Sequence, residues 1–202
     1  MGLVAMAALV SGARAGHLVS FPTDTVPALA VRPDQGERIY TIKQRAADKP
    51  LILMAATIDH LFAYLDRDHP QFAHWLEIVR LNFPGAITLV LPANELGRSF
   101  NQGIDTLGIR IPDHPLAQGI LQQTGPLLTT SVNLSGMPPL REMSNIATQF
   151  PSVLTLGDCA NNCVNIYDAT GSGQPSTVVA WSETGWQVCR QGEPELKTAL
   201  KN

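Results

Sequence analysis

The sequence predicts an α/β fold with a twisted, mixed parallel and antiparallel sheet and flanking helices. Short unbroken apolar runs, typical of strands covered on both faces, alternate with segments of helical period. The 202 residues lie within the range of one large domain. Neither a repeat nor a long linker divides the chain, so we expect a single domain over residues 1–202.

Composition favours a globular protein that takes small ligands. Apolar residues make up 45% and charged residues 15% of the chain, which argues against disorder. A net charge of -3 gives no overall positive field to attract nucleic acid. No run reaches the roughly 20 apolar residues of a membrane span, so we expect no membrane association.

The cysteines and histidines predict neither a disulfide framework nor a metal site. Three cysteines, at positions 159, 163 and 189, are expected to be reduced thiols of a cytoplasmic protein. The five histidines show no His-Glu-x-x-His pattern, and we expect no metal ligands among the protein residues.

Apolar runs and helix-ending residues predict the first elements of the chain. An Ala-rich run predicts a helix over residues 3–14, and because no positive segment precedes it, we prefer this to a signal peptide. Residues 17–21 should extend as a strand. Residues 37–43 have the period of a short helix, and residues 51–55 form an apolar run typical of a buried strand.

The same alternation continues to the end of the chain. We expect helices over residues 58–65, 71–81, 115–124 and 143–150. Strands are expected over residues 87–91, 106–111, 127–134 and 152–156. Residues 176–181 and 186–190 should close the chain as a hairpin across the turn at residues 182–185.

Lys43 and Arg45 form a candidate cation pair. Residues two apart on a helix do not share a face, so both reach one ligand only if the helix ends near Lys43. The Asp48-Lys49-Pro50 turn favours such an end. A point charge beside a planar guanidinium suits a triphosphate at the mouth of a cleft, although a solvated surface pair fits the spacing as well.

A second candidate lies on the strand predicted over residues 127–134. Thr129, Ser131 and Asn133 alternate there, so their side chains should share one face of the sheet. Hydroxyl and amide groups at a strand end can fix nucleotide oxygens. The alternative is ordinary turn chemistry in the segment Asn133-Leu134-Ser135-Gly136.

Other segments are weaker candidates on their own. Residues 171–177 are rich in Gly, Ser and Thr but lack the Lys and spacing of a P-loop. Arg110 alternates with two isoleucines and should face a polar cleft or solvent, and Arg190 has a similar setting. No Gly-x-Ser-x-Gly elbow is present, so covalent catalysis is not expected.

Taken in order, eight segments resemble the YrdC-like family of threonylcarbamoyl-AMP synthases over nearly the whole chain. They are Phe21-Pro22-Thr23-Asp24-Thr25-Val26, Lys43-x-Arg45, Lys49-Pro50-Leu51, Phe83-Pro84-Gly85, Arg110-Ile111-Pro112, Thr130-Ser131-x-Asn133-x-Ser135-Gly136, Ser176-Thr177-Val178-Val179 and Arg190-x-Gly192.

This resemblance implies a deep, positively lined concave cleft and assigns roles within it. It implies an ATP-binding tetrad in which two cations are catalytic and two polar residues bind the nucleotide, namely Lys43, Arg45, Ser131 and Asn133. Ser176 and Arg190 would also contact the nucleotide. Thr23, Thr25 and Arg110 would bind L-threonine.

The implied activity is that of a nucleotidyltransferase. It would combine L-threonine, bicarbonate and ATP into threonylcarbamoyl-AMP and pyrophosphate, with Mg²⁺, for tRNA threonylcarbamoyladenosine modification. tRNA and tRNA-modification proteins are the implied partners. Two alternatives stay open: a paralogue that makes a different carbamoyl-adenylate, and an RNA-binding or ribosome-associated module. Because the chain is acidic overall, a small anionic ligand in a locally basic cleft is favoured over RNA.

The sequence departs from the family pattern at Pro27-Ala28, where Tyr-Gly is typical, so we expect a differently shaped threonine side of the cleft. Residues 161–174 are polar and contain glycine, and we predict a closing lid there.

Overall fold

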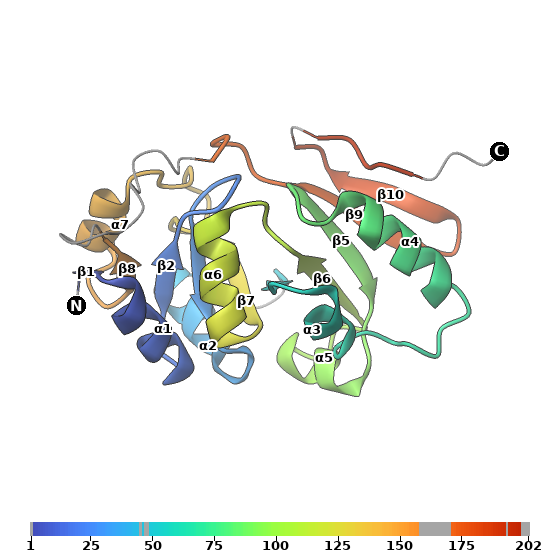
Figure 1. Ribbon diagram of the computed structural model, residues 1–202, viewed down its shortest axis with the longest axis horizontal. Coiled ribbons are helices and arrows are strands. Elements are labelled where there is room, and N and C mark those ends of the chain that lie inside the picture. The colour runs from blue at the N-terminus through green and yellow to red at the C-terminus, as the bar shows by residue number, and fades with distance from the viewer. Residues whose placement is uncertain (1, 45, 47–48, 158–170, 193, 199–202) are drawn as a thin grey trace.

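A computed structural model describes residues 2–44, 46, 49–157, 171–192 and 194–198 (Figure 1). Within these residues, ten strands form one mixed sheet in the order β1-β8-β2-β3-β7-β4-β6-β5-β9-β10. The strands are β1 (Leu3–Val4), β2 (Val19–Phe21), β3 (Ala28–Val31), β4 (Ile52–Met54), β5 (Ile87–Pro92), β6 (Thr106–Arg110), β7 (Leu127–Ser131), β8 (Leu154–Leu156), β9 (Thr177–Ser182) and β10 (Gly185–Arg190). The predicted mixed sheet is therefore confirmed.

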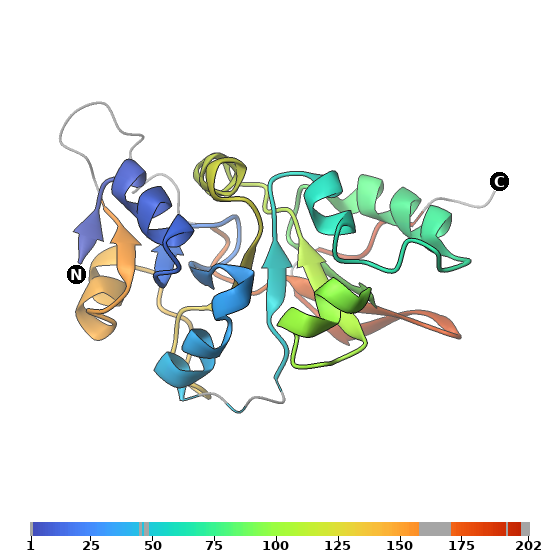
Figure 2. The same ribbon diagram turned by 90° about the horizontal axis from the view of Figure 1, so that it is seen from below.

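Helices flank this sheet along its length (Figures 1 and 2). They are α1 (Met6–Arg14), α2 (Glu37–Lys43), α3 (Ile58–Phe62), α4 (Phe72–Asn82), α5 (Glu95–Phe100), α6 (Pro115–Thr124) and α7 (Met143–Gln149), with a short 3₁₀ helix, η1 (Pro33–Gln35). Four strand pairs are parallel, β1 with β8, β2 with β8, β4 with β6 and β5 with β9. The other neighbours run antiparallel, including the β9–β10 hairpin predicted at the end of the chain.

Two apolar clusters pack against the strands. In the smaller cluster, α1 and α6 cover β2, β3 and the start of β7. The larger cluster joins side chains of α2, α3, α4 and α7 to strands β3, β4, β5, β6, β7 and β9, with the fully buried Trp75 of α4 among them. In the central strands every second residue, such as Leu53, Ile109 and Leu128, enters this larger cluster. The intervening side chains point to the opposite face, which α6 covers only in part (Figure 1).

Several predicted boundaries are wrong, because pairing distant in sequence decides them. The helix predicted over residues 3–14 begins at Met6, because Leu3 and Val4 pair with β8 as a short parallel strand. The strand predicted over residues 127–134 ends at Ser131. Neither β3 nor α5 was predicted. Strand β3 is buried along its whole length, whereas α5 buries only Gly97.

Candidate functional site

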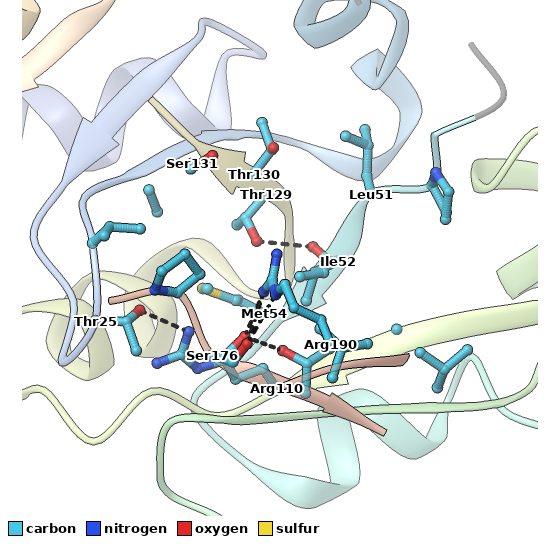
Figure 3. Close-up of a pocket in the computed structure, with 18 of the residues that line it drawn as sticks. Thr25, Leu51, Ile52, Met54, Arg110, Thr129, Thr130, Ser131, Ser176 and Arg190 are labelled. Carbon is cyan, nitrogen blue, oxygen red and sulfur yellow. Dashed lines mark hydrogen bonds between the residues drawn. The ribbon is translucent and has the colours of Figure 1, made fainter. Parts of the chain in front are cut away.

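A cleft of about 400 Å³ lies on the open face of the central strands (Figure 3). Alternate residues of adjacent strands form its floor, for example Ile52 of β4, Gly108 of β6 and Thr129 of β7. Among the described residues that line it, Lys49, Arg110 and Arg190 are cationic and none carries a carboxylate. Such a lining suits an anionic ligand.

One end of the cleft is built around Arg110, at the end of β6. Its guanidinium donates to Asp24 Oδ1 at 2.6 Å, to Thr25 Oγ1 at 2.9 Å and to the Gly85 carbonyl at 3.0 Å. The Arg110 side chain is 3% exposed and that of Asp24 14% exposed, so this ion pair is largely shielded from water. Burial lowers the pKa of Arg110, and the Asp24 carboxylate opposes that shift.

The threonines before β3 are held in the same network. Thr23 Oγ1 donates to the Val26 carbonyl at 2.8 Å and lies 3.0 Å from Thr25 Oγ1. The backbone N–H of Thr25 also donates to Thr23 Oγ1 at 3.2 Å. Both side chains are buried, and only Thr25 reaches the cleft lining. Thr23 therefore supports Thr25, which in turn fixes Arg110.

Arg190 enters the cleft beside this network (Figure 3). It donates to the Ser176 carbonyl from Nη2 at 2.9 Å and from Nε at 3.1 Å. The Ser176 hydroxyl lies 2.8 Å from Thr88 Oγ1 on the neighbouring β5. Burial, and then the positive charge of Arg110, lower the pKa of Arg190. The two guanidinium groups thus converge, as a site for an anion requires.

The opposite end of the cleft contains Ser131, the last residue of β7. The Lys43 ammonium donates to the Ser131 carbonyl and, at 3.0 Å, to Asn133 Oδ1. Ser131 Oγ donates to the same Asn133 Oδ1 at 2.6 Å. The Asn133 amide donates in turn to the carbonyls of Leu134 and Met137. Three predicted tetrad residues, Lys43, Ser131 and Asn133, therefore lie together.

The end of helix α2 brings Lys43 to this position. The helix ends at Lys43, as predicted, because Gln44 turns the chain with a left-handed φ of 50°. The N–H of Ser135 then donates to the Lys43 carbonyl at 3.1 Å, which ties the helix end to the segment after β7. Lys43 is 1% exposed, so its ammonium lies behind Ser131 and not at the cleft mouth.

The predicted site residues divide into two groups. Five of them line the cleft, namely Thr25, Arg110, Ser131, Ser176 and Arg190. Thr23, Lys43 and Asn133 lie behind that lining as hydrogen-bonding partners. Arg45 lies outside the described residues, as do Cys159 and Cys163.

Sequence reasoning missed several residues of the site. Thr88 and Thr106 line the cleft, and each alternates with apolar core residues of its strand. That alternation was the available signal, but neither threonine was among the predicted site residues. The sequence offered no signal for the pairing of Asp24 with Arg110, since 86 residues separate them.

The predicted lid falls mainly outside the described residues, which resume at Gly171. From there the chain runs beside the threonine segment. The N–H of Ser172 donates to the Asp24 carbonyl at 3.0 Å, and that of Gly173 to the Thr25 carbonyl at 2.9 Å. A side chain at position 171 would collide with the backbone of residues 23–25, which explains the glycine there.

Two further properties concern metals and membranes. Within the described part of the chain, no three His, Cys, Asp or Glu side chains cluster as metal ligands would. None of the helices described is long and apolar enough to cross a membrane.

A family model covers most of this chain. The Sua5/YciO/YrdC model, described as telomere recombination, matches residues 12–192, which include every strand of the cleft. The chain belongs to this family. Membership in the Sua5/YciO/YrdC family agrees with the resemblance seen in the sequence motifs.

Curated members of the Sua5/YciO/YrdC family are similar over most of the chain. A threonylcarbamoyl-AMP synthase of Vibrio vulnificus is 36% identical over 153 residues, which span 73% of this chain and 82% of that protein. A threonylcarbamoyl-AMP synthase of Escherichia coli is 35% identical over 151 residues, 72% of this chain and 79% of that protein.

Solved structures of the family share the fold. Sua5 of P. abyssi, crystallised with L-threonine, matches 93% of this chain with a TM-score of 0.78 and 28% identity. This chain spans only 54% of that Sua5 chain. E. coli YciO matches 95% of this chain and 91% of its own, with a TM-score of 0.75 and 24% identity, which shows the fold alone.

Proposed function

We propose that this chain is an L-threonylcarbamoyl-adenylate synthase, a nucleotidyltransferase that uses L-threonine, bicarbonate and ATP. The observation that carries the proposal is a cleft lined by cations and hydroxyls in a chain 35–36% identical to proteins named threonylcarbamoyl-AMP synthase. The L-threonine complex of the related Sua5 supports threonine as the amino acid.

The proposed chemistry needs no protein nucleophile. The threonine amine adds to bicarbonate with loss of water, which gives a carbamate. A carbamate oxygen then attacks the α-phosphorus of ATP, the bond from that phosphorus to the β-phosphate oxygen breaks, and pyrophosphate leaves. Reactions of this kind depend on alignment and on cations that stabilise the developing negative charge.

We assign the ATP side of the reaction to the Ser131 end of the cleft. Lys43 carries a positive charge directly behind Ser131, where it favours phosphate groups over the end of β7. The Ser131 hydroxyl and the Asn133 amide are held to each other and would keep that charge oriented. Arg45 remains part of this proposal on the sequence resemblance.

We assign L-threonine to the Arg110 end. Thr25 and Arg110 are fixed there before any ligand binds, because Asp24 and Gly85 hold the guanidinium. Arg190 and Ser176 lie at the same end and would meet the carboxylate of L-threonine. Preformed geometry of this kind reduces the entropy cost of aligning two substrates.

Mg²⁺ would enter this cleft on the phosphates of ATP. Mg²⁺ commonly binds through substrate phosphates and waters, and the described residues offer no cluster of metal ligands. Both points favour binding of Mg²⁺ through the phosphates of ATP. The product would serve tRNA modification in the cytoplasm, with tRNA or tRNA-modification proteins as partners.

Pyrophosphate release tests the proposal. The purified chain should release pyrophosphate from ATP and bicarbonate only when L-threonine is present, and L-serine and L-valine serve as matched amino-acid controls. Release that ignores threonine would contradict the proposal. Salt-sensitive RNA binding without any turnover would favour the RNA-binding alternative instead.

A further inference from the structure

Gly108 occupies the centre of the cleft floor. The strand register aligns it with Ile52 of β4 on one side and Val90 of β5 on the other. Ile52 in turn lies opposite Thr129 of β7. These residues form one row across four adjacent strands, and all of them line the cleft.

The two polar ends of the cleft lie on opposite sides of this row. Arg110 follows Gly108 by two residues along β6, and Ser131 follows Thr129 by two residues along β7. β7 runs antiparallel to β4, which is parallel to β6, so the two steps lead in opposite directions. Figure 3 shows the result, with Thr129 and Ile52 between Ser131 and Arg110.

A glycine inside a strand is unfavourable unless something requires it. Such glycines usually mark a bulge, a close approach of another backbone, or a site where a ligand lies against the strand. The β6 register is regular on both sides of Gly108, which excludes a bulge. Its φ is not in the left-handed region, so the backbone does not require glycine either.

Close packing does not require this glycine. A Cβ on Gly108 would lie 3.5 Å from Ile52 Cγ1 and 3.5 Å from Thr88 Cγ2, which is ordinary van der Waals contact. By contrast, a Cβ on Gly97 would collide with the Tyr64 carbonyl, so packing explains that glycine. A side chain at position 108 would extend into the cleft.

We infer that Gly108 determines whether the two substrates can meet. Because Gly108 has no side chain, space remains there for the threonine carbamate at the Arg110 end to contact ATP at the Ser131 end. A side chain there would separate the carbamate from the α-phosphorus while leaving both ends of the cleft intact. This inference rests on the proposed function and adds a positioning residue to it.

The test uses Gly108→Ala and Gly108→Val, with Gly119→Ala on helix α6 as a matched control outside the cleft lining. Threonine-dependent pyrophosphate release should fall about tenfold in Gly108→Ala and about a hundredfold or more in Gly108→Val, because misaligned substrates react slowly. Gly119→Ala should retain the wild-type rate. Val is favoured in strands, so the melting temperature of Gly108→Val should equal or exceed that of wild type.

Binding measurements separate lost alignment from lost binding. Affinities of Gly108→Val for α,β-methylene-ATP alone and for L-threonine alone should change by less than about threefold. A Gly108→Val variant that turns over at the wild-type rate, or that loses either single ligand, would overturn the inference. Absence of threonine-dependent release in wild type would instead contradict the proposed function.

Discussion

The two ends of the cleft hold their positive charges in different ways. At one end, Arg110 is paired with the Asp24 carboxylate at 2.6 Å and is almost fully buried. At the other, the Lys43 ammonium lies directly behind the cleft lining, where it donates to the Ser131 carbonyl and to Asn133 Oδ1. The buried ion pair of Arg110 fixes the shape of its end, whereas the Lys43 charge lies where it can attract an anion to the end of β7. We therefore expect Arg110 to matter most for stability and Lys43 most for turnover.

Removing Arg110 should have the largest effect. Arg110→Met leaves the Asp24 carboxylate buried without its partner, so the free energy of unfolding should fall by about 3–5 kcal/mol. Arg98→Met is the matched control, because its pair with Asp105 is exposed and should be worth less than about 1 kcal/mol. Denaturant unfolding measures both. Equal losses in the two variants would contradict the structural role of Arg110.

Removing the Lys43 charge should chiefly affect catalysis. Lys43→Met keeps most of the buried stem but removes the ammonium behind Ser131. We expect kcat/KM for ATP to fall by about 100- to 1000-fold, as for loss of a preorganised donor to developing charge. Steady-state kinetics at saturating L-threonine measures this. A loss below about threefold would show that the Lys43 charge has no catalytic use.

Arg190 should give an intermediate effect. Arg190→Gln retains a donor toward the Ser176 carbonyl but removes the charge, so kcat/KM for L-threonine should fall by roughly ten- to a hundredfold. Arg190→Lys keeps a charge without the planar fork and should recover part of the loss. If Arg190→Gln and Arg190→Lys were equally impaired, fork geometry and not charge would be decisive.

Thr25 should give the smallest effect of the series. Thr25→Val removes the Oγ1 acceptor of Arg110 at nearly constant volume, and it should cost about 1–3 kcal/mol of stability. The KM for L-threonine should rise while the KM for ATP stays constant, since Thr25 lies at the Arg110 end. A matching rise in both KM values would contradict the division of the cleft into two ends.

Local sequence signals predicted much of the fold. Helices α2 and α6 have the predicted boundaries, because apolar period and terminal residues define both. Strand β1 was missed since its two residues become a strand only by pairing with β8, about 150 residues away along the chain. Helix α5 was missed because its short sequence has no apolar stripe, and contacts such as Gly97 against Tyr64 position it.

The residue types of the candidate site could be predicted from the sequence better than their arrangement in space. Alternation along β7 placed Thr129 and Ser131 on one face, and both line the cleft. The strand ends at Ser131, however, so a hydrogen bond and not strand geometry brings Asn133 beside it. The burial of Lys43 depends on the contact between the α2 end and β7, which joins residues 88 apart.

The central claim is that both ends of one cleft are filled in a single reaction. Its most direct test is incubation of the chain with ATP, Mg²⁺, L-threonine and ¹³C-bicarbonate, followed by mass spectrometry of the nucleotide products. We predict threonylcarbamoyl-AMP that carries one ¹³C atom and forms in equal amount to pyrophosphate. Pyrophosphate accompanied by unlabelled AMP alone, or formed equally without L-threonine, would contradict the claim.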